Sequence, residues 1–241
     1  MSNSFFKFKE FTIHQDQCAM KVCTDSCLFG AWISKAFSSF LTSEKKMLDI
    51  GTGTGLLSLM MAQKNEGQFD ALEIELDAAI QARENLSSSP WSQRIQIIQK
   101  SLQEFKPSFK YDVIISNPPF FEGDLKSEAG NKNNAKHDTA LTLDYLILFI
   151  SSNLKPGGKA SVIIPYHRTK YFEKQLHQSF FIEQKVLVRQ TPRHDFFRAM
   201  YIFSNKVQQQ MVLEKQISIR NQDGEYDAVF IELLKDYYLN F

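Results

Sequence analysis

The sequence has few of the residues and runs that mark several large classes of protein. Its 241 residues include three cysteines, two tryptophans and seven prolines, and the formal net charge is +1. The longest apolar run, near residues 145–150, is far too short to span a membrane. The opening segment, MSNSFFKFKEF, has no apolar stretch like that of a signal peptide. These absences predict a soluble cytoplasmic protein without membrane association.

The sequence also lacks the patterns of metal sites, disulfide frameworks and two classes of hydrolase. Cys18, Cys23 and Cys27 lie close together, but they form no C-x-x-C pair and no histidine follows at ligand spacing. Their odd number argues against a disulfide framework, so we expect buried, reduced thiols and no bound metal. The chain contains no H-E-x-x-H or G-x-S-x-G motif, which leaves metalloprotease and serine-hydrolase functions without support. A polyanionic partner would need a locally basic surface, because the net charge is close to zero.

Hydrophobic periodicity predicts strands that alternate with helices. The strand-like runs are rich in Val, Ile and Leu, which is typical of a parallel sheet covered by helices on both faces. Before the sheet, we expect a hairpin with its polar turn at residues 14–17, and then a helix over residues 27–36 capped by Thr24 or Asp25. The expected strands cover residues 45–50, 69–74, 94–99, 111–116, 159–165, 181–190, 196–204 and 213–220, and further helices cover residues 55–64, 76–86, 141–154, 169–178 and 227–239.

No internal repeat or linker divides the chain, so we expect one domain over residues 1–241. Within it, a hairpin and helix occupy residues 1–44, the main α/β core residues 45–205, and a further strand and helix residues 206–241. The segment at residues 122–140 has almost no apolar residue to anchor it and is interpreted as a mobile loop.

A glycine-rich turn follows the first strand of the expected sheet. Gly51, Gly53 and Gly55 alternate with threonine in LDIGTGTGLLSL. Leu56 stands where the dinucleotide fingerprint needs glycine, and no Gly-Lys-Ser/Thr of a P-loop follows. Glycines let a ligand approach the backbone, and a helix N-terminus favours a negative group. Asp49 would repel a phosphate but could hold an ammonium, so the turn suits a ligand with both an amino group and a carboxylate.

The next expected strand ends with two carboxylates, Glu73 and Glu75. A carboxylate at this place is the usual partner of ribose hydroxyls in nucleotide-binding α/β folds. Glu73 is preferred because it lies nearer the strand end. An amino acid joined to a nucleoside describes S-adenosylmethionine. The alternative is that the glycine turn serves only to pack a strand against a helix.

From about Lys45 to Pro165 the pattern resembles the class I S-adenosylmethionine-dependent methyltransferases. D-x-G-x-G-x-G resembles their first motif, and LKPGGKASVIIP their entry to the fifth strand. The resemblance implies a Rossmann-like α/β fold with a mostly parallel seven-stranded sheet, preceded by the hairpin and helix. It also implies that the glycine turn faces the methionine portion of the cofactor, Asp49 its amino group and Glu73 its ribose. Ser101, followed by Leu102, stands where an aspartate usually contacts the adenine.

The segment ISNPPFF stops a strand and builds a rigid corner. Asn117 is pushed out of the helical region by Pro118, and neither Pro118 nor Pro119 has an N–H for a sheet. NPPF resembles the fourth-strand motif of family members that methylate planar nitrogens. The Asn117 side-chain oxygen and the Pro118 carbonyl can accept the two N–H groups of an aromatic amine and favour its developing positive charge. Phe120 can stack on the ring, and Asn117 also borders the cofactor; the alternative is a plain turn.

The similarity narrows to one family over nearly the whole chain. QDQCAMKVCTDSCLFGAWI, QARENLSSSPWSQRI and GEYDAVFIELLKDYYL resemble segments of bacterial tRNA adenine-N6 methyltransferases. That family acts on the adenosine just 3′ of the anticodon, position 37, in one valine tRNA. The resemblance implies S-adenosylmethionine as cofactor and tRNA with a turned-out adenine as partner, and we expect a monomer. It also implies that Lys21, Thr24 and Asp25 line the cofactor entrance, although a capped helix beside a surface lysine explains them equally well.

Local basic residues are candidates for RNA contacts. RQTPRHDFFR brings Arg189, Arg193 and Arg198 together with phenylalanines, as in a platform for single-stranded RNA. A solvated strand end with core phenylalanines is the alternative. Lys132 and Lys136 fall in the polar loop, where plain solvated disorder is the simpler interpretation. The residues of the corner alone do not distinguish three possible methyl acceptors: adenine N6, guanine N2 and the amide nitrogen of a protein glutamine. A second alternative is a protein that binds the cofactor and RNA without catalysing methyl transfer.

Overall fold

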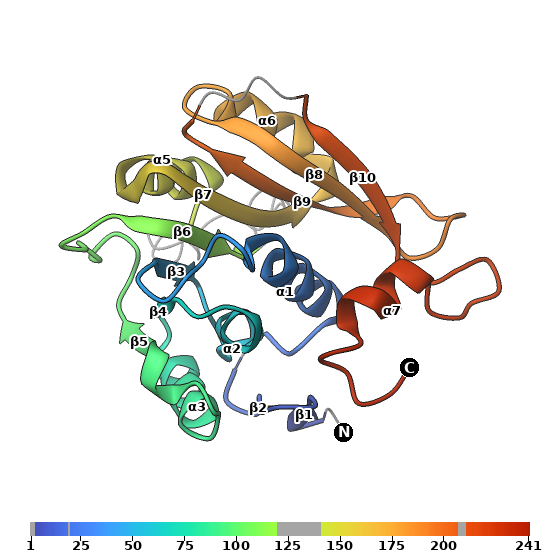
Figure 1. The fold of residues 1–241 in the computed structure, drawn as a ribbon, viewed down its shortest axis with the longest axis horizontal. Coiled ribbons are helices and arrows are strands. Elements are labelled where there is room, and N and C mark those ends of the chain that lie inside the picture. The colour runs from blue at the N-terminus through green and yellow to red at the C-terminus, as the bar shows by residue number, and fades with distance from the viewer. Residues whose placement is uncertain (1–2, 19, 120–140, 207–210) are drawn as a thin grey trace, which may run out of the picture.

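The computed structural model describes residues 3–18, 20–119, 141–206 and 211–241. Its centre is a mixed sheet with the strand order β10-β8-β9-β7-β6-β3-β4-β5 (Figure 1). Neighbouring strands pair in parallel, except that β9 is antiparallel to both β7 and β8. The strands are β3 (Lys46–Ile50), β4 (Gln68–Glu73), β5 (Ile95–Gln99), β6 (Tyr111–Ser116), β7 (Leu154–Pro165), β8 (Phe181–Arg189), β9 (Phe196–Ser204) and β10 (Leu213–Ser218).

The predicted α/β class and mostly parallel sheet are confirmed. Among the described residues the main sheet has eight strands rather than seven, because the C-terminal strand β10 joins its edge beside β8. Every residue of β6 is buried, as expected of a parallel strand covered on both faces. The predicted loop at residues 122–140, and with it Lys132 and Lys136, lies outside the described residues, as does Phe120.

Helices cover both faces of the sheet (Figure 1). One apolar core combines buried residues of α1, α2, α3 and α7 with one face of the sheet, and a second core combines α5 and α6 with the other face. Seven of the nine residues of α2 are buried, so its packing rather than an amphipathic stripe holds it in place. The helices are α1 (Thr24–Phe37), α2 (Leu56–Lys64), α3 (Leu76–Ser87), α5 (Leu143–Asn153), α6 (Thr169–Leu176) and α7 (Ala228–Leu234), with short 3₁₀ turns η1 (Ser92–Arg94) and η2 (Tyr166–Arg168).

The predicted hairpin forms, but its turn was placed wrongly. Strands β1 (Phe5–Lys7) and β2 (Thr12–His14) pair antiparallel, and the Phe8 N–H donates to the Phe11 carbonyl at 2.9 Å between them. The rings of Phe8 and Phe11 stack 4.5 Å apart and are buried in the core, while Lys9 and Glu10 between them are exposed at the turn. The polar residues at 14–17 instead run along α3.

Three element boundaries also differ from the prediction. Helix α1 begins at Thr24 after the extended residue Cys23, which makes no side-chain cap, so the prediction that Thr24 or Asp25 caps the helix was wrong. Strand β7 begins at Leu154 because Leu154 already pairs with Tyr111, so the KPGG segment lies inside the strand. Helix α7 ends at Leu234, short of the expected residue 239.

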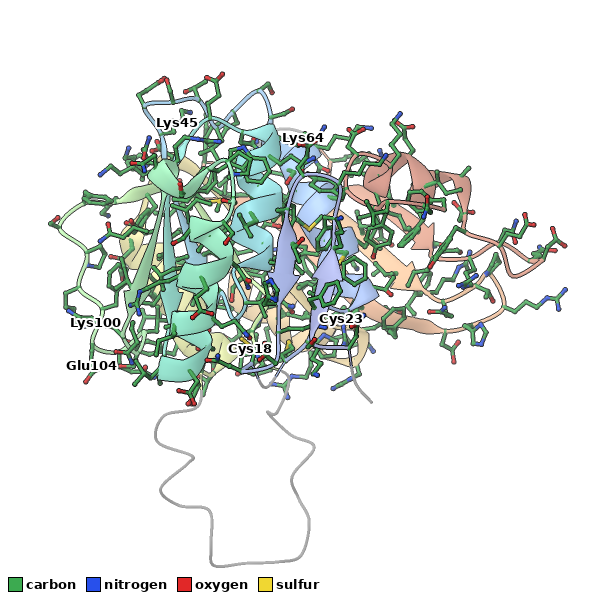
Figure 2. All side chains as sticks on the ribbon, turned by 90° about the horizontal axis from the view of Figure 1, so that it is seen from below. Cys18, Cys23, Lys45, Lys64, Lys100 and Glu104 are labelled. Atoms are coloured by element: carbon green, nitrogen blue, oxygen red, sulfur yellow. The ribbon has the colours of Figure 1, made fainter. Side chains whose placement is uncertain are left out.

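The register of the sheet brings distant segments to one edge. The carboxyl ends of β3, β4, β5, β6, β7, β8 and β10 and the amino end of β9 form this edge, called the carboxyl edge below. Ile50 pairs with Ser116, and Pro165 pairs with Arg198. Figure 2 shows Cys18, Cys23 and Lys100, which follows β5, at one end of the molecule, with Lys45, which precedes β3, at the opposite end.

Candidate functional site

The glycine turn forms an open platform at the end of β3. The N–H groups of Gly51 and Thr52 donate to the Leu72 carbonyl at 2.9 and 3.0 Å, which folds the turn over the end of β4. Gly51, Gly53 and Gly55 have φ angles of 72°, 55° and 84°, a left-handed conformation that favours glycine. A Cβ atom at Gly51 or Gly53 would meet no atom within 4 Å. The backbone here is therefore accessible to a ligand.

Asp49 lies beneath this turn with one oxygen lacking a donor. Its Oδ2 accepts hydrogen bonds from Thr52 Oγ1 at 2.7 Å and Ser58 Oγ at 2.8 Å. Its Oδ1 is buried and has no hydrogen-bond partner among the residues described. Burial raises the pKa of Asp49 to about 6; the two hydroxyls oppose this shift, and the charge of Glu73 adds to it. A buried acceptor without a donor is unfavourable, so Oδ1 is suited to a ligand that brings a positively charged donor.

Glu73 ends β4 and connects the glycine turn to α3. Its side chain is almost buried, with the residue 7% exposed. Oε2 accepts from the Gly53 N–H at 2.7 Å, and Oε1 accepts from the N–H groups of Ile74 and Glu75 at 2.9 and 3.0 Å. These bonds fix the carboxylate and occupy both lone pairs of Oε1, which leaves one lone pair on Oε2 for a further donor. Glu73 thus occupies the strand end as expected, whereas its contact with a ribose stays a prediction.

Ser101, at the position expected to contact adenine, makes its hydrogen bonds to a neighbouring residue. The Ser101 hydroxyl donates to Glu104 Oε2 at 2.8 Å and accepts from the Glu104 N–H at 3.3 Å, so it stabilises a turn after β5. Leu102 beside it is buried. Ile74 directly follows Glu73 and is 41% exposed, which makes it a further candidate that the sequence analysis did not single out. An apolar residue immediately after the strand-end carboxylate was the signal that could have found it.

The proline corner lies next to the glycine turn, as the sheet register requires. Ser116 and Ile50 are paired, and Asn117 and Gly51 directly follow the ends of these two adjacent strands. Asn117 Nδ2 donates to Ser26 Oγ at 2.9 Å, whereas Asn117 Oδ1 is buried without a partner among the described residues. Within the described residues, four buried side-chain oxygens have no hydrogen-bond partner, and two of these four are Asp49 Oδ1 and Asn117 Oδ1. The site therefore presents two unpaired acceptors.

An apolar hollow borders the other side of the corner. Pro118 is buried and Pro119 is exposed, so the corner contributes both to the core and to the surface. The hollow lies between this corner and the end of β7. Its lining consists of Pro118, Pro119, Leu141, Leu143, Ile164, Pro165 and Arg168.

The predicted entrance residues have different surroundings. Thr24 is exposed in the first turn of α1, and Lys21 is half-buried in the segment before that helix. Asp25 forms an ion pair in which Arg198 Nε donates to its Oδ2 at 2.7 Å. Thus Asp25 and Arg198, predicted separately as a cofactor residue and an RNA residue, bind each other.

The other predicted RNA residues lie on the β8 and β9 side of the carboxyl edge. Arg189 Nε donates to Ser218 Oγ at 3.1 Å, and its guanidinium lies 5.3 Å from the centre of the Phe196 ring. Arg193 is exposed in the turn between β8 and β9. The ring of Tyr166, at the end of β7, lies 5.5 Å from that of Phe196. Two arginines and two aromatic rings therefore share this part of the edge.

Two further features concern metals and membranes. Within residues 3–18, 20–119, 141–206 and 211–241, no group of three or more His, Cys, Asp or Glu side chains is arranged to hold a metal ion. No helix in those ranges has the length and apolarity needed to cross a bilayer. The three cysteines are free thiols, with Cys18 and Cys27 buried and Cys23 half-buried. Burial raises the pKa of all three thiols.

The family model that matches this chain and two of its curated relatives are all methyltransferases. Residues 32–190 match the family model of the methyltransferase small domain. A tRNA1(Val) (adenine(37)-N6)-methyltransferase of Dyadobacter fermentans is 41% identical, with 99% of each chain covered. A protein of the same name from Cytophaga hutchinsonii is 39% identical, with 100% of each chain covered.

Solved structures agree on the fold. A predicted O-methyltransferase from Agrobacterium tumefaciens superposes with a TM-score of 0.64 at 14% identity, over 88% of this chain and 95% of the other. A methyltransferase from Pyrococcus furiosus gives a TM-score of 0.55 at 18% identity, over 75% and 83% of the two chains. These likenesses establish the Rossmann-like fold of class I methyltransferases.

Proposed function

Because the chain belongs to the methyltransferase small domain family, we propose that it is an S-adenosylmethionine-dependent tRNA methyltransferase that modifies N6 of adenosine 37 in valine tRNA. Full-length relatives with 39% and 41% identity that carry this activity in their names support the substrate. The observation that carries the proposal is the buried, unpaired Oδ1 of Asn117 beside the open glycine turn.

The residues at the glycine turn fit S-adenosylmethionine. Asp49 Oδ1 offers the acceptor that an ammonium requires, and Glu73 offers the remaining lone pair of Oε2 for a ribose hydroxyl. Gly51 and Gly53 leave the backbone open for close approach. Ile74 presents an exposed apolar side chain for the adenine ring, in place of a polar contact from Ser101. When bound, the cofactor supplies a methyl group already activated by a positively charged sulfur.

The proline corner supplies the acceptor side of the reaction. The lone pair of an adenine N6 is delocalised into the ring, so this amine is a weak nucleophile. Asn117 Oδ1 and the Pro118 carbonyl accept its two N–H groups and favour the positive charge that develops on N6. Transfer would join the methyl group of the cofactor to the N6 lone pair, and the electron pair of the broken C–S bond would remain on the sulfur. N6 then releases one proton to solvent, so the residues need to hold the amine rather than deprotonate it beforehand.

The β8 and β9 side of the carboxyl edge supplies the RNA contacts. Arg189 and Arg193 lie there with Phe196 and Tyr166, a combination that suits phosphates together with unstacked bases. The same edge carries Asn117, so RNA bound at the arginines can deliver an extruded adenine to the corner. Lys132 and Lys136 remain predictions for RNA contact outside the described residues.

Methyl transfer to unmodified tRNA tests this function directly. The purified protein is incubated with a labelled methyl donor and valine tRNA transcribed in vitro, and the nucleosides are analysed after digestion. We expect labelled N6-methyladenosine, and none from a transcript with guanosine at position 37. Labelled methylguanosine, or label found only in added protein, would instead identify one of the other planar nitrogens as the acceptor. Asn117→Ala serves as the inactive control.

A further inference from the structure

Ser26 lies directly behind the amide of Asn117. It belongs to the first turn of α1, and it is 5% exposed. Its Oγ accepts the 2.9 Å hydrogen bond from Asn117 Nδ2. Because α1 and β6 are far apart in the chain, only the folded structure brings these two side chains together.

In this contact Ser26 binds the Nδ2 end of the Asn117 amide. An asparagine side chain has a donor end and an acceptor end, and a rotation of about 180° exchanges them. With Nδ2 bound to Ser26, Oδ1 is the end that lacks a partner among the described residues. The opposite orientation would present N–H groups to the N–H groups of the substrate amine. Such a donor–donor contact would oppose methyl transfer.

The surroundings of Ser26 are compatible with this role. Cys23 Sγ lies 2.9 Å from Ser26 Oγ. When the Ser26 hydroxyl donates to Cys23 Sγ, its oxygen is left as an acceptor only, so it selects Nδ2, the donor end of the Asn117 amide. Ser26 is thereby held between the residue before α1 and the corner after β6.

The ion pair of Asp25 and Arg198 anchors this part of α1 to the sheet. The Ser26 N–H donates to Asp25 Oδ1 at 3.1 Å, and Arg198 Nε donates to Asp25 Oδ2 at 2.7 Å. The side chains of Asp25 and Arg198 are only 14% and 22% exposed. Arg198 belongs to β9 and pairs with Pro165 of β7, so the anchor is part of the central sheet.

We propose that Ser26 is a positioning residue for methyl transfer: it holds the Asn117 amide with its oxygen toward the substrate amine, and the Asp25–Arg198 ion pair holds Ser26 in place. This inference rests on the proposed function of the corner. It also assigns Arg198 a role behind the site instead of a contact with RNA.

The Ser26→Ala variant tests the first part. We expect kcat to fall about 10- to 100-fold, while the dissociation constants of S-adenosylhomocysteine and tRNA stay within about twofold. Ser26→Thr, which keeps the hydroxyl, restores most of the rate. The matched control is Ser34→Ala in the same helix, because Ser34 is also buried and its hydroxyl bonds to the Met60 carbonyl away from the corner. Ser34→Ala lowers stability but leaves kcat within about twofold.

A double-mutant cycle separates positioning from a general structural effect. If Ser26 acts only through Asn117, then Ser26→Ala has no further effect on kcat once Asn117→Ala is present. An equal loss of rate in both backgrounds would overturn the proposal, as would wild-type kcat in Ser26→Ala.

A measurement without turnover distinguishes this proposal from the proposed function. In ¹⁵N-labelled protein, the side-chain NH₂ signals of Asn117 are assigned by their loss in Asn117→Ala. We expect their hydrogen exchange to be at least about tenfold faster in Ser26→Ala than in wild type, because the hydrogen bond is lost. Unchanged exchange would refute the positioning contact. Absence of methyl transfer by the wild-type protein would refute the proposed function while leaving this readout valid.

The anchor is tested by comparing two arginines at the same edge. Arg198→Ala is expected to lower kcat about tenfold with little change in the dissociation constant of tRNA, whereas Arg193→Ala is expected to weaken tRNA binding. Asp25→Asn is expected to reproduce the effect of Arg198→Ala. Loss of tRNA affinity in Arg198→Ala with wild-type kcat would show that Arg198 contacts RNA and would overturn this part.

Discussion

The Ser116 hydroxyl donates a 2.9 Å hydrogen bond to the Ile50 carbonyl and so joins the last residue of β6 to the last residue of β3. Both residues are buried, and they are paired in the sheet. The glycine turn starts one residue after Ile50, and the proline corner starts one residue after Ser116. The two halves of the candidate site are therefore fixed to each other by backbone pairing and by this side chain.

Asn117→Ala removes the unpaired acceptor while leaving the glycine turn intact. We expect kcat to fall by roughly 10²- to 10³-fold, the usual effect of losing one group that stabilises developing charge. Calorimetry with S-adenosylhomocysteine is expected to give an affinity within about threefold of wild type, because the loss concerns the transition state rather than cofactor binding. Wild-type turnover in this variant would refute the role of the corner.

Glu73→Gln tests the carboxylate at the end of β4. The substitution replaces one carboxylate oxygen, which accepts backbone N–H groups, with an NH₂ group that cannot accept them. It also removes the negative charge that strengthens hydrogen bonds from hydroxyl groups. We expect affinity for S-adenosylhomocysteine to fall at least about tenfold, equivalent to about 1.4 kcal/mol. Glu75→Gln is the matched control, because Glu75 is exposed two residues later. Similar losses in both variants would point to a general charge effect.

Asp49 makes stability depend on pH in a defined direction. Its pKa is raised to about 6 in the folded state, against about 4 in an unfolded chain. Between these values the folded state retains a proton that the unfolded state has released. The free energy of unfolding therefore falls by on the order of 2 kcal/mol as pH rises from about 4 to 6, and this contribution is constant above that range.

Urea unfolding of the cofactor-free protein checks this prediction. Wild type and Asp49→Asn are compared at each pH, so that contributions from other titrating groups cancel in the difference. We expect the stability of wild type relative to Asp49→Asn to decrease with rising pH. A difference that is constant or increases would contradict the assigned shift.

Removal of Arg189 or Arg193 is expected to change the salt dependence of tRNA binding. If each arginine neutralises one phosphate, each alanine variant lowers the slope of log affinity against log salt by about 1. The control is Lys45→Ala, because Figure 2 shows Lys45 at the end of the molecule opposite Cys18 and Cys23. Filter binding between low and physiological salt measures the slopes. Equal slopes in all variants would exclude phosphate contacts by these arginines.

Asn85 connects the N-terminal segment to the glycine turn, and its loss is expected to loosen both. Asn85 Oδ1 accepts from the His14 N–H at 2.9 Å, and Nδ2 donates to the carbonyls of His14 and Thr54, each at 2.9 Å. Asn85→Ala leaves these backbone groups without partners and costs about 1–3 kcal/mol. Thermal unfolding measures the loss, and proteolysis before α1 is expected to accelerate. The exposed neighbour Glu84, changed to Gln, is expected to behave as wild type.

The sequence was sufficient to place residues whose position follows from the ends of strands. Asp49 is the residue before the last in β3, Glu73 ends β4 and Asn117 follows β6, and parallel pairing brings these strand ends to one edge. The fold followed from the same alternation of strands and helices.

Contacts between distant side chains could not be predicted in this way. Ser26 and Asn117 are 91 residues apart, and Asp25 and Arg198 are 173 apart, with no periodicity that relates them. The hairpin turn was misplaced because the polar run at residues 14–17 suggested a turn, whereas the chain reverses at the exposed Lys9 and Glu10, between the buried Phe8 and Phe11.

The order of strands along the carboxyl edge has a consequence for redesign. Everything assigned to the methyl donor and to the reacting amine precedes Pro165 in the chain, whereas Arg189 and Arg193 follow it. Grafting residues 166–241 from a relative with a different RNA target would therefore retarget the enzyme without rebuilding its chemistry. Such a chimera must retain an arginine at position 198, since Asp25 in the unchanged half has its ion pair across the graft boundary.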